Sequence, residues 1–171
     1  MANALLVIDM QKDFIDGSLG TSEAKLIVPN VVSRIKKAIE QDEDIYFTLD
    51  THYDDYLNTL EGKHLPVVHC IEGTSGWELD ESIKRFQDKA KGILKKNHFG
   101  YQNIAEELKG YDKITIIGLC TDICVVANAM LLKVGLDNTE LYVEKNCCAG
   151  VTCDKHEAAL KTMESCQINI I

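Results

Sequence analysis

The chain has 171 residues, of which 46% are hydrophobic, and a formal net charge of −9. This length suits one domain spanning residues 1–171, large enough to bury roughly two thirds of its unfolded surface. The acidic balance excludes a polyanion-binding surface, so we expect no nucleic-acid partner. No run approaches the ~18 apolar residues of a membrane span, and the start lacks the basic stretch of a signal peptide. We therefore expect a cytoplasmic protein with no membrane partner.

The chain has an odd number of cysteines, seven. Without an export signal the compartment is expected to be reducing, and most thiols are then small buried hydrophobes. One of them, Cys124, differs because it falls in the first turn of a predicted helix, directly after a predicted buried strand.

Short apolar runs alternate with amphipathic stretches along the whole chain. Pro29 is expected in the first turn of the first helix, because proline suits that position. A long irregular stretch, residues 50–76, follows the second strand, and its length suggests a functional loop. The expected strands are residues 4–8, 45–49, 92–94, 114–117, 141–143 and 168–171, and the expected helices begin near Val28, Ile104, Asp122 and His156.

Strands that alternate with helices predict right-handed crossovers and a parallel sheet. The predicted fold is therefore an α/β, three-layer α/β/α sandwich with a mainly parallel six-stranded sheet, Rossmann-like in its layers. In such sheets the ligand crevice lies at the carboxyl ends of the strands. Those ends carry Asp9, Asp50 with His52, Lys96 and, after a turn, Cys124.

Asp9, Lys96 and Cys124 form a plausible nucleophile set. Cys124 falls in the first turn of a helix, where free N–H groups and the helix dipole favour a thiolate. In this reading Asp9 takes the thiol proton and Lys96 stabilises the thiolate. The thiolate then attacks a carbonyl carbon, and the backbone N–H groups of Cys120 and Cys124 hold the oxyanion. Asp9 returns the proton to the leaving group, and water hydrolyses the thioester.

Three blocks of the sequence resemble the catalytic blocks of the isochorismatase-like cysteine hydrolases, and most closely those of the nicotinamidase (pyrazinamidase) branch. They are Val7-Ile8-Asp9-Met10-Gln11-Lys12-Asp13-Phe14, Lys96-Asn97-His98-Phe99-Gly100-Tyr101 and Gly118-Leu119-Cys120-Thr121-Asp122-Ile123-Cys124. The resemblance covers nearly the whole chain. It implies an Asp-Lys-Cys triad at Asp9, Lys96 and Cys124. Lys96 is preferred to Lys95 because the lysine of the family lies three residues before an aromatic residue. The resemblance also implies a cis peptide at Leu119–Cys120 that directs the Cys120 N–H into the oxyanion hole.

A second set of residues suits one divalent metal ion. Asp50-x-His52 offers a carboxylate and an imidazole, and Glu61 and His69 follow in the long loop. The resemblance implies metal ligands at Asp50, His52 and His69, with Glu61 or His64 completing the site and Tyr56 outside it. It implies zinc, with manganese or iron as alternatives, and no organic cofactor. In the family the metal anchors the pyridine-ring nitrogen of the substrate and does not carry out the hydrolysis.

Phe14, Phe99 and Tyr101 are the predicted aromatic contacts of a flat substrate. Nicotinamidases often have a tryptophan shortly before the metal-binding histidine, but this chain has Leu65-Pro66-Val67-Val68 there, and its only tryptophan is Trp77. This departure weakens the assignment of the substrate more than that of the reaction.

The leading hypothesis is a metal-dependent cysteine amidohydrolase that converts nicotinamide to nicotinate and ammonia through a thioacyl-enzyme. The alternative is a hydrolase of the same family that acts on another small amide, ureide or carbamoyl compound. A catalytically silent binding module is a third reading, and the complete triad argues against it. Isochorismatase activity proper is disfavoured because it uses a different residue at the nucleophile position. A homo-oligomer, dimer or tetramer, is expected from the resemblance.

Overall fold

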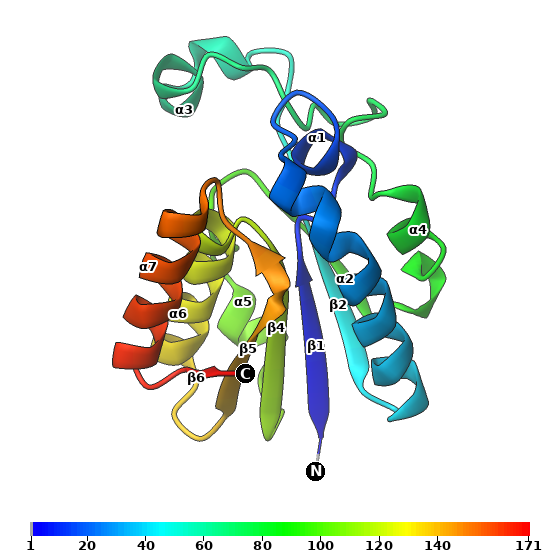
Figure 1. Ribbon diagram of the computed structural model, residues 1–171, viewed down its shortest axis with the longest axis vertical. Coiled ribbons are helices and arrows are strands. Elements are labelled where there is room, and N and C mark those ends of the chain that lie inside the picture. The colour runs from blue at the N-terminus through cyan, green and yellow to red at the C-terminus, as the bar shows by residue number, and fades with distance from the viewer. Residues whose placement is uncertain (1) are drawn as a thin grey trace.

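The computed structural model describes residues 2–171, in which a parallel sheet is covered by helices on both faces (Figure 1). The strand order is β3-β2-β1-β4-β5-β6, and every ladder is parallel, so the predicted fold class is confirmed. The strands are β1 (Asn3–Ile8), β2 (Asp44–Asp50), β3 (Gly92–Lys96), β4 (Lys113–Leu119), β5 (Glu140–Ala149) and β6 (Asn169–Ile170).

Helices cover both faces of the sheet. The α-helices are α1 (Lys12–Ile15), α2 (Ser22–Glu40), α3 (Leu60–His64), α4 (Glu81–Lys84), α5 (Ile104–Glu107), α6 (Val126–Gly135) and α7 (Cys153–Ser165). Two 3₁₀ turns, η1 (Tyr56–Asn58) and η2 (Gln87–Lys89), and a π-helical turn, η3 (Thr121–Val125), complete the set. No helix within residues 2–171 is both long and apolar enough to cross a membrane.

The central strand β1 is buried on both faces, as its unbroken apolar sequence predicts. Leu5 and Val7 pack with α2 and α4, while Leu6 and Ile8 pack with α5, α6 and α7. This alternation follows from the period of two along a strand. Figure 1 shows α2 and α4 on one side of the sheet and α6 and α7 on the other.

The first long helix begins earlier than predicted. Thr21 caps its N-terminus by accepting a hydrogen bond from Ala24 N at 3.0 Å, so Pro29 lies inside α2 and not in its first turn. Pro29 is exposed, and water can therefore reach the carbonyl that loses its partner. The capping threonine is the signal that defines this start.

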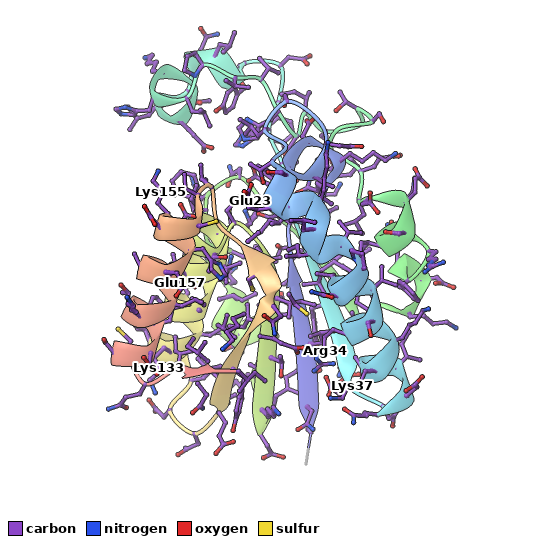
Figure 2. All side chains as sticks on the ribbon, viewed as in Figure 1. Glu23, Arg34, Lys37, Lys133, Lys155 and Glu157 are labelled. Atoms are coloured by element: carbon purple, nitrogen blue, oxygen red, sulfur yellow. The ribbon has the colours of Figure 1, made fainter. Side chains whose placement is uncertain are left out.

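An ion-paired arginine links α2 to the residue before β2 and to β5. Arg34, labelled in Figure 2, contacts Glu43 at 2.7 Å and Glu144 in β5 at 3.0 Å.

The strand β5 is longer than predicted. It continues to Ala149, well beyond residue 143, because its pairing with β4 resumes after an irregularity between Ile116 and Gly118.

Phe47 should carry a large share of the α2-side core. Its side chain is fully buried in β2, and Phe→Ala changes at such sites cost about 3–5 kcal/mol through lost burial and a residual cavity. We expect Phe47→Ala to lower the free energy of unfolding in urea by about that amount. Leu26→Ala on α2, where the side chain is 74% exposed, should change it by less than about 0.5 kcal/mol. Equal losses in the two variants would contradict this assignment of the core.

Candidate active site

Three side chains from different strand ends meet in a buried cluster. Asp9 directly follows β1, Lys96 ends β3, and Cys124 lies in the π-helical turn after β4. Lys96 Nζ lies 2.6 Å from Asp9 Oδ2 and 3.4 Å from Cys124 Sγ. The topology therefore brings together the three residues that the sequence analysis proposed as a triad.

Strand alternation separates the two adjacent lysines. Lys96 is buried, whereas the side chain of Lys95 is half exposed and pairs with Glu72. The Lys95 ammonium also lies 5.0 Å from the centre of the Trp77 ring. Only Lys96 can therefore reach the thiol.

Burial dominates the protonation of the cluster. It raises the pKa of the Cys124 thiol well above its usual value, and the Lys96 ammonium opposes this rise without cancelling it. Burial likewise raises the pKa of the Asp9 carboxyl, again against the effect of Lys96. Burial therefore opposes the thiolate that the helix start was expected to favour, and the raised pKa makes the Asp9 carboxylate a stronger base than an exposed carboxylate.

A tight turn delivers Cys124 to this place. Gly118 has φ +118°, and a Cβ there would lie 2.1 Å from Ile8 O, so the position requires glycine. The Leu119–Cys120 peptide is cis, which confirms the expectation. Cys120 O accepts hydrogen bonds from Ile123 N and Val125 N, both at 3.0 Å, and this closes a π-helical turn where an ordinary first helical turn was expected.

Carboxylate and imidazole groups form a second cluster beside the first. The possible ligand atoms of Asp50, His52 and His69 all lie within 4.8 Å of one another. Asp50 Oδ2 is 3.0 Å from His52 Nε2 and 3.4 Å from His69 Nε2. His69 Nδ1 donates to Val67 O at 2.8 Å, which turns Nε2 toward the cluster.

Glu61, and not His64, extends this cluster. Glu61 Oε1 on α3 lies 3.6 Å from His52 Nε2 and 4.0 Å from His69 Nε2, whereas His64 is exposed. Tyr56 packs its ring against both histidines, and burial raises the pKa of its phenol to about 12, so it stays protonated. Two carboxylates and two imidazoles, three of them buried, fit a divalent metal ion.

The sequence of the chain matches a known family along nearly its whole length. Residues 3–171 match the isochorismatase domain. The chain belongs to the isochorismatase family.

Relatives within this family agree with that assignment. The chain is 24% identical to the nicotinamidase/pyrazinamidase of Mycobacterium tuberculosis, over 98% of this chain and 97% of that protein. It superposes on the pyrazinamidase of Pyrococcus horikoshii in complex with zinc with a TM-score of 0.84 at 28% identity, covering 100% and 99% of the two chains. It superposes on the nicotinamidase of Bacillus subtilis with a TM-score of 0.87 at 26% identity, covering 99% of each.

In this family member Asp50 connects the two clusters. Its Oδ2 faces the two histidines, while its Oδ1 lies 3.3 Å from Lys96 Nζ. Burial alone would raise the pKa of Asp50, but hydrogen bonds from His52 and His69 and the charge of Lys96 hold it well below its usual value. The carboxylate is therefore charged throughout the physiological range.

Two buried side chains that the sequence analysis missed hold Asp9 and the backbone of Asp50. Thr48 Oγ1 donates to Asp9 Oδ1 at 2.5 Å and accepts from Asp9 N at 3.1 Å. Gln11 accepts from Asp50 N at 2.7 Å and donates to the carbonyls of Asp50 and Trp77, both at 2.8 Å. The available signal was polarity: each is a polar residue within or directly after an apolar strand.

The predicted aromatic contacts do not all lie together. The Phe14 ring centre lies 5.6 Å from that of His69, beside the second cluster. Tyr101 packs against the core, and Phe99 is 50% exposed. Trp77 donates its indole N–H to Thr51 Oγ1 at 3.0 Å and packs on the α2-side core, so it does not replace the tryptophan missing before His69.

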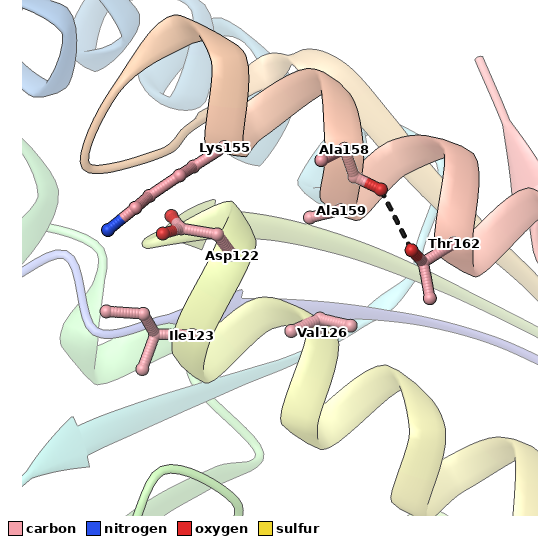
Figure 3. Close-up of a pocket in the computed structure, with 7 residues that line it drawn as sticks. All are labelled: Asp122, Ile123, Val126, Lys155, Ala158, Ala159 and Thr162. Atoms are coloured by element: carbon pink, nitrogen blue, oxygen red, sulfur yellow. Dashed lines mark hydrogen bonds between the residues drawn. The ribbon is translucent and has the colours of Figure 1, made fainter.

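A shallow groove on the outside of the π-helical turn is separate from the triad. Asp122, Ile123 and Val126 face Lys155 and Ala158 of α7 across it (Figure 3), and neither Cys124 nor Lys96 lines it. The Asp122 carboxylate accepts a hydrogen bond from Val151 N at 3.0 Å. This groove is therefore a seam between the nucleophile turn and α7.

Proposed function

We propose that this chain hydrolyses nicotinamide to nicotinate and ammonia. Its family and relatives make it an amidohydrolase. The observation that carries the proposal is the contact of Lys96 Nζ with three groups: Asp9 Oδ2 at 2.6 Å, Asp50 Oδ1 at 3.3 Å and Cys124 Sγ at 3.4 Å. A nucleophile set and a ring-anchoring set are thereby joined through one ammonium group.

The proposed chemistry uses Asp9 as an acid and a base. Asp9 takes the proton of the Cys124 thiol, and the thiolate attacks the amide carbonyl carbon. The N–H groups of Cys120 and Cys124 hold the oxyanion, and Lys96 keeps the carboxylate and the sulfur in place. Asp9 then protonates the amide nitrogen, ammonia leaves, and a thioacyl-enzyme remains. Water, deprotonated by Asp9, releases the carboxylate product and restores the thiol.

The second cluster is proposed to hold one divalent ion through Asp50, His52, His69 and Glu61. Zinc is the leading candidate, in line with the zinc complex of the P. horikoshii pyrazinamidase. When bound, the ion supplies a Lewis-acid position for the ring nitrogen of the substrate. Phe14 is placed to line the ring beside His69.

Removal of the metal should weaken binding of the substrate ring and leave the reactivity of the Cys124 thiol unchanged. We expect chelation, or His69→Ala, to lower kcat/KM for nicotinamide by at least about tenfold. Benzamide, which lacks the ring nitrogen, should lose much less. The rate at which iodoacetamide alkylates Cys124 should stay near that of the untreated enzyme, since the triad remains. Lys63→Ala on α3 is the matched surface control. An equal loss for both amides would contradict ring anchoring.

A second candidate is hydrolysis of another small amide, ureide or carbamoyl compound. It is favoured by the segment Leu65-Pro66-Val67-Val68, which brings no aromatic residue to the ring position before His69. Ammonia release across a panel of nicotinamide, pyrazinamide, a ureide and a carbamoyl compound distinguishes the two. Turnover of a non-aromatic member alone would replace nicotinamide as the substrate. The cytoplasmic location and the homo-oligomer stay predictions.

A further inference from the structure

A fully buried asparagine sits one helical turn beyond the nucleophile. Asn128 lies inside α6, and its side chain has no exposed surface. Asparagine is a weak helix former, and burial of an amide is unfavourable unless its donors and acceptor are paired. Its place in an otherwise apolar helix face therefore needs a reason beyond packing.

The amide of Asn128 joins two segments of the active site. Its Nδ2 donates to Cys124 O at 2.8 Å and to Phe99 O at 3.2 Å. Its Oδ1 accepts from Tyr101 N at 2.8 Å. One side chain is thus bonded to the backbone of the nucleophile and, at two points, to the segment that follows β3.

That segment carries Lys96. The Lys96 ammonium donates to His98 O at 3.2 Å, one residue before the carbonyl that Asn128 binds. Gly100 brings the segment close to α6, because a Cβ there would lie 2.5 Å from Leu131 Cδ1. The distance from Lys96 to Cys124 therefore depends on how residues 96–101 pack against α6. Asn128 makes polar contacts between this segment and α6.

We propose that Asn128 is a positioning residue, which sets the register between the Lys96 segment and the Cys124 turn. It touches no reacting atom. The proposal rests on the proposed function only in taking Cys124 as the reacting thiol. Loss of the amide would let the segment shift against α6, and a displacement on the order of 1 Å in such a set can cost about 100-fold in rate.

The test uses two variants and one control. Asn128→Ala removes the amide, and Asn128→Leu removes it while keeping the branched shape of the side chain. Leu132→Ala, one turn further along α6 and equally buried, weakens the same core without removing a hydrogen bond to the segment. For each protein we would measure Tm, kcat and KM for nicotinamide, and the iodoacetamide rate of Cys124 by mass spectrometry of its peptide, all well below the lowest Tm.

We expect both Asn128 variants to lose about 10- to 100-fold in kcat and to alkylate more slowly at Cys124, while Leu132→Ala keeps both rates despite a lower Tm. The proposal is overturned if the Asn128 variants have a lower Tm but unchanged kcat and alkylation rates. It is also overturned if Leu132→Ala lowers these rates as much as the Asn128 variants do, because the amide is then purely structural. Wild-type enzyme that releases no ammonia from nicotinamide would refute the proposed substrate, and the alkylation rates would still decide the role of Asn128.

Discussion

Cys124→Ala should abolish ammonia release from nicotinamide, with a loss of at least about 10³-fold in kcat. The reason is chemical: the substitution removes the sulfur that lies 3.4 Å from Lys96 Nζ, so no thioacyl-enzyme can form, and water is a weaker nucleophile than a thiolate. Ammonia measured against time, with protein concentration fixed, gives the rate. Since the Cys124 side chain is small and buried, the alanine variant should fold, which circular dichroism and Tm can verify.

Cys153→Ala is the matched control for this loss. Cys153 is an exposed thiol at the first residue of α7, and it should be dispensable. Quenching wild-type turnover with acid should also trap a nicotinoyl adduct on the peptide that contains Cys124. Turnover that survives Cys124→Ala would remove the thiol from the mechanism.

The pKa of Cys124 depends on burial that the local sequence does not encode. The sequence places the thiol at a helix start, which favours the thiolate. The structure adds nearly complete burial, and desolvation is the larger influence on the pKa. Local sequence could not reveal this, because burial depends on α6, α7 and β4 packing around the turn. The consequence is mechanistic: a thiol with a raised pKa needs a nearby proton acceptor, which is the role proposed for Asp9.

Much of the fold was predictable because the strands are locally encoded. The apolar run of β1 predicts a strand covered on both faces, and the parallel topology then brings Asp9, Asp50 and Lys96 to one edge. The residues that hold this edge together were not predictable. Thr48, Gln11 and Asn128 each form hydrogen bonds to residues 27 or more positions away in the chain, for which a single sequence gives no pairing information.

Whether Glu61 or His64 joins the metal cluster also depends on contacts between distant parts of the chain. Both lie on α3, three residues apart, and either residue type can bind a divalent metal. The direction in which α3 presents each side chain to His52 and His69 is set by the docking of the long loop. Backbone hydrogen bonds from His52 N to Cys70 O and from Glu72 N to His52 O, both at 2.9 Å, seat that loop.

Lys96→Met should be the most damaging single change to the site as a whole. It keeps most of the side-chain volume but leaves two buried carboxylates, Asp9 and Asp50, without their shared cation. Breaking a buried pair in this way costs about 3–5 kcal/mol of stability. We also expect kcat for nicotinamide to fall by about 10²- to 10⁴-fold, because the thiolate and the base both lose their partner. Lys95→Met, at the half-exposed neighbour, should leave stability and turnover close to wild type.

The stability loss of Lys96→Met should shrink as the pH is lowered. Burial already raises the pKa of Asp9 in the native enzyme, and without the ammonium it is raised further. A carboxyl with a raised native pKa contributes stability below its unfolded pKa and loses it as the pH rises through the native pKa. Urea unfolding of both proteins in the same zinc-containing buffer should therefore show a wide gap near about pH 7 and a narrower one near about pH 5. A gap that widens on acidification would mean that the ammonium does not neutralise Asp9 in the folded chain.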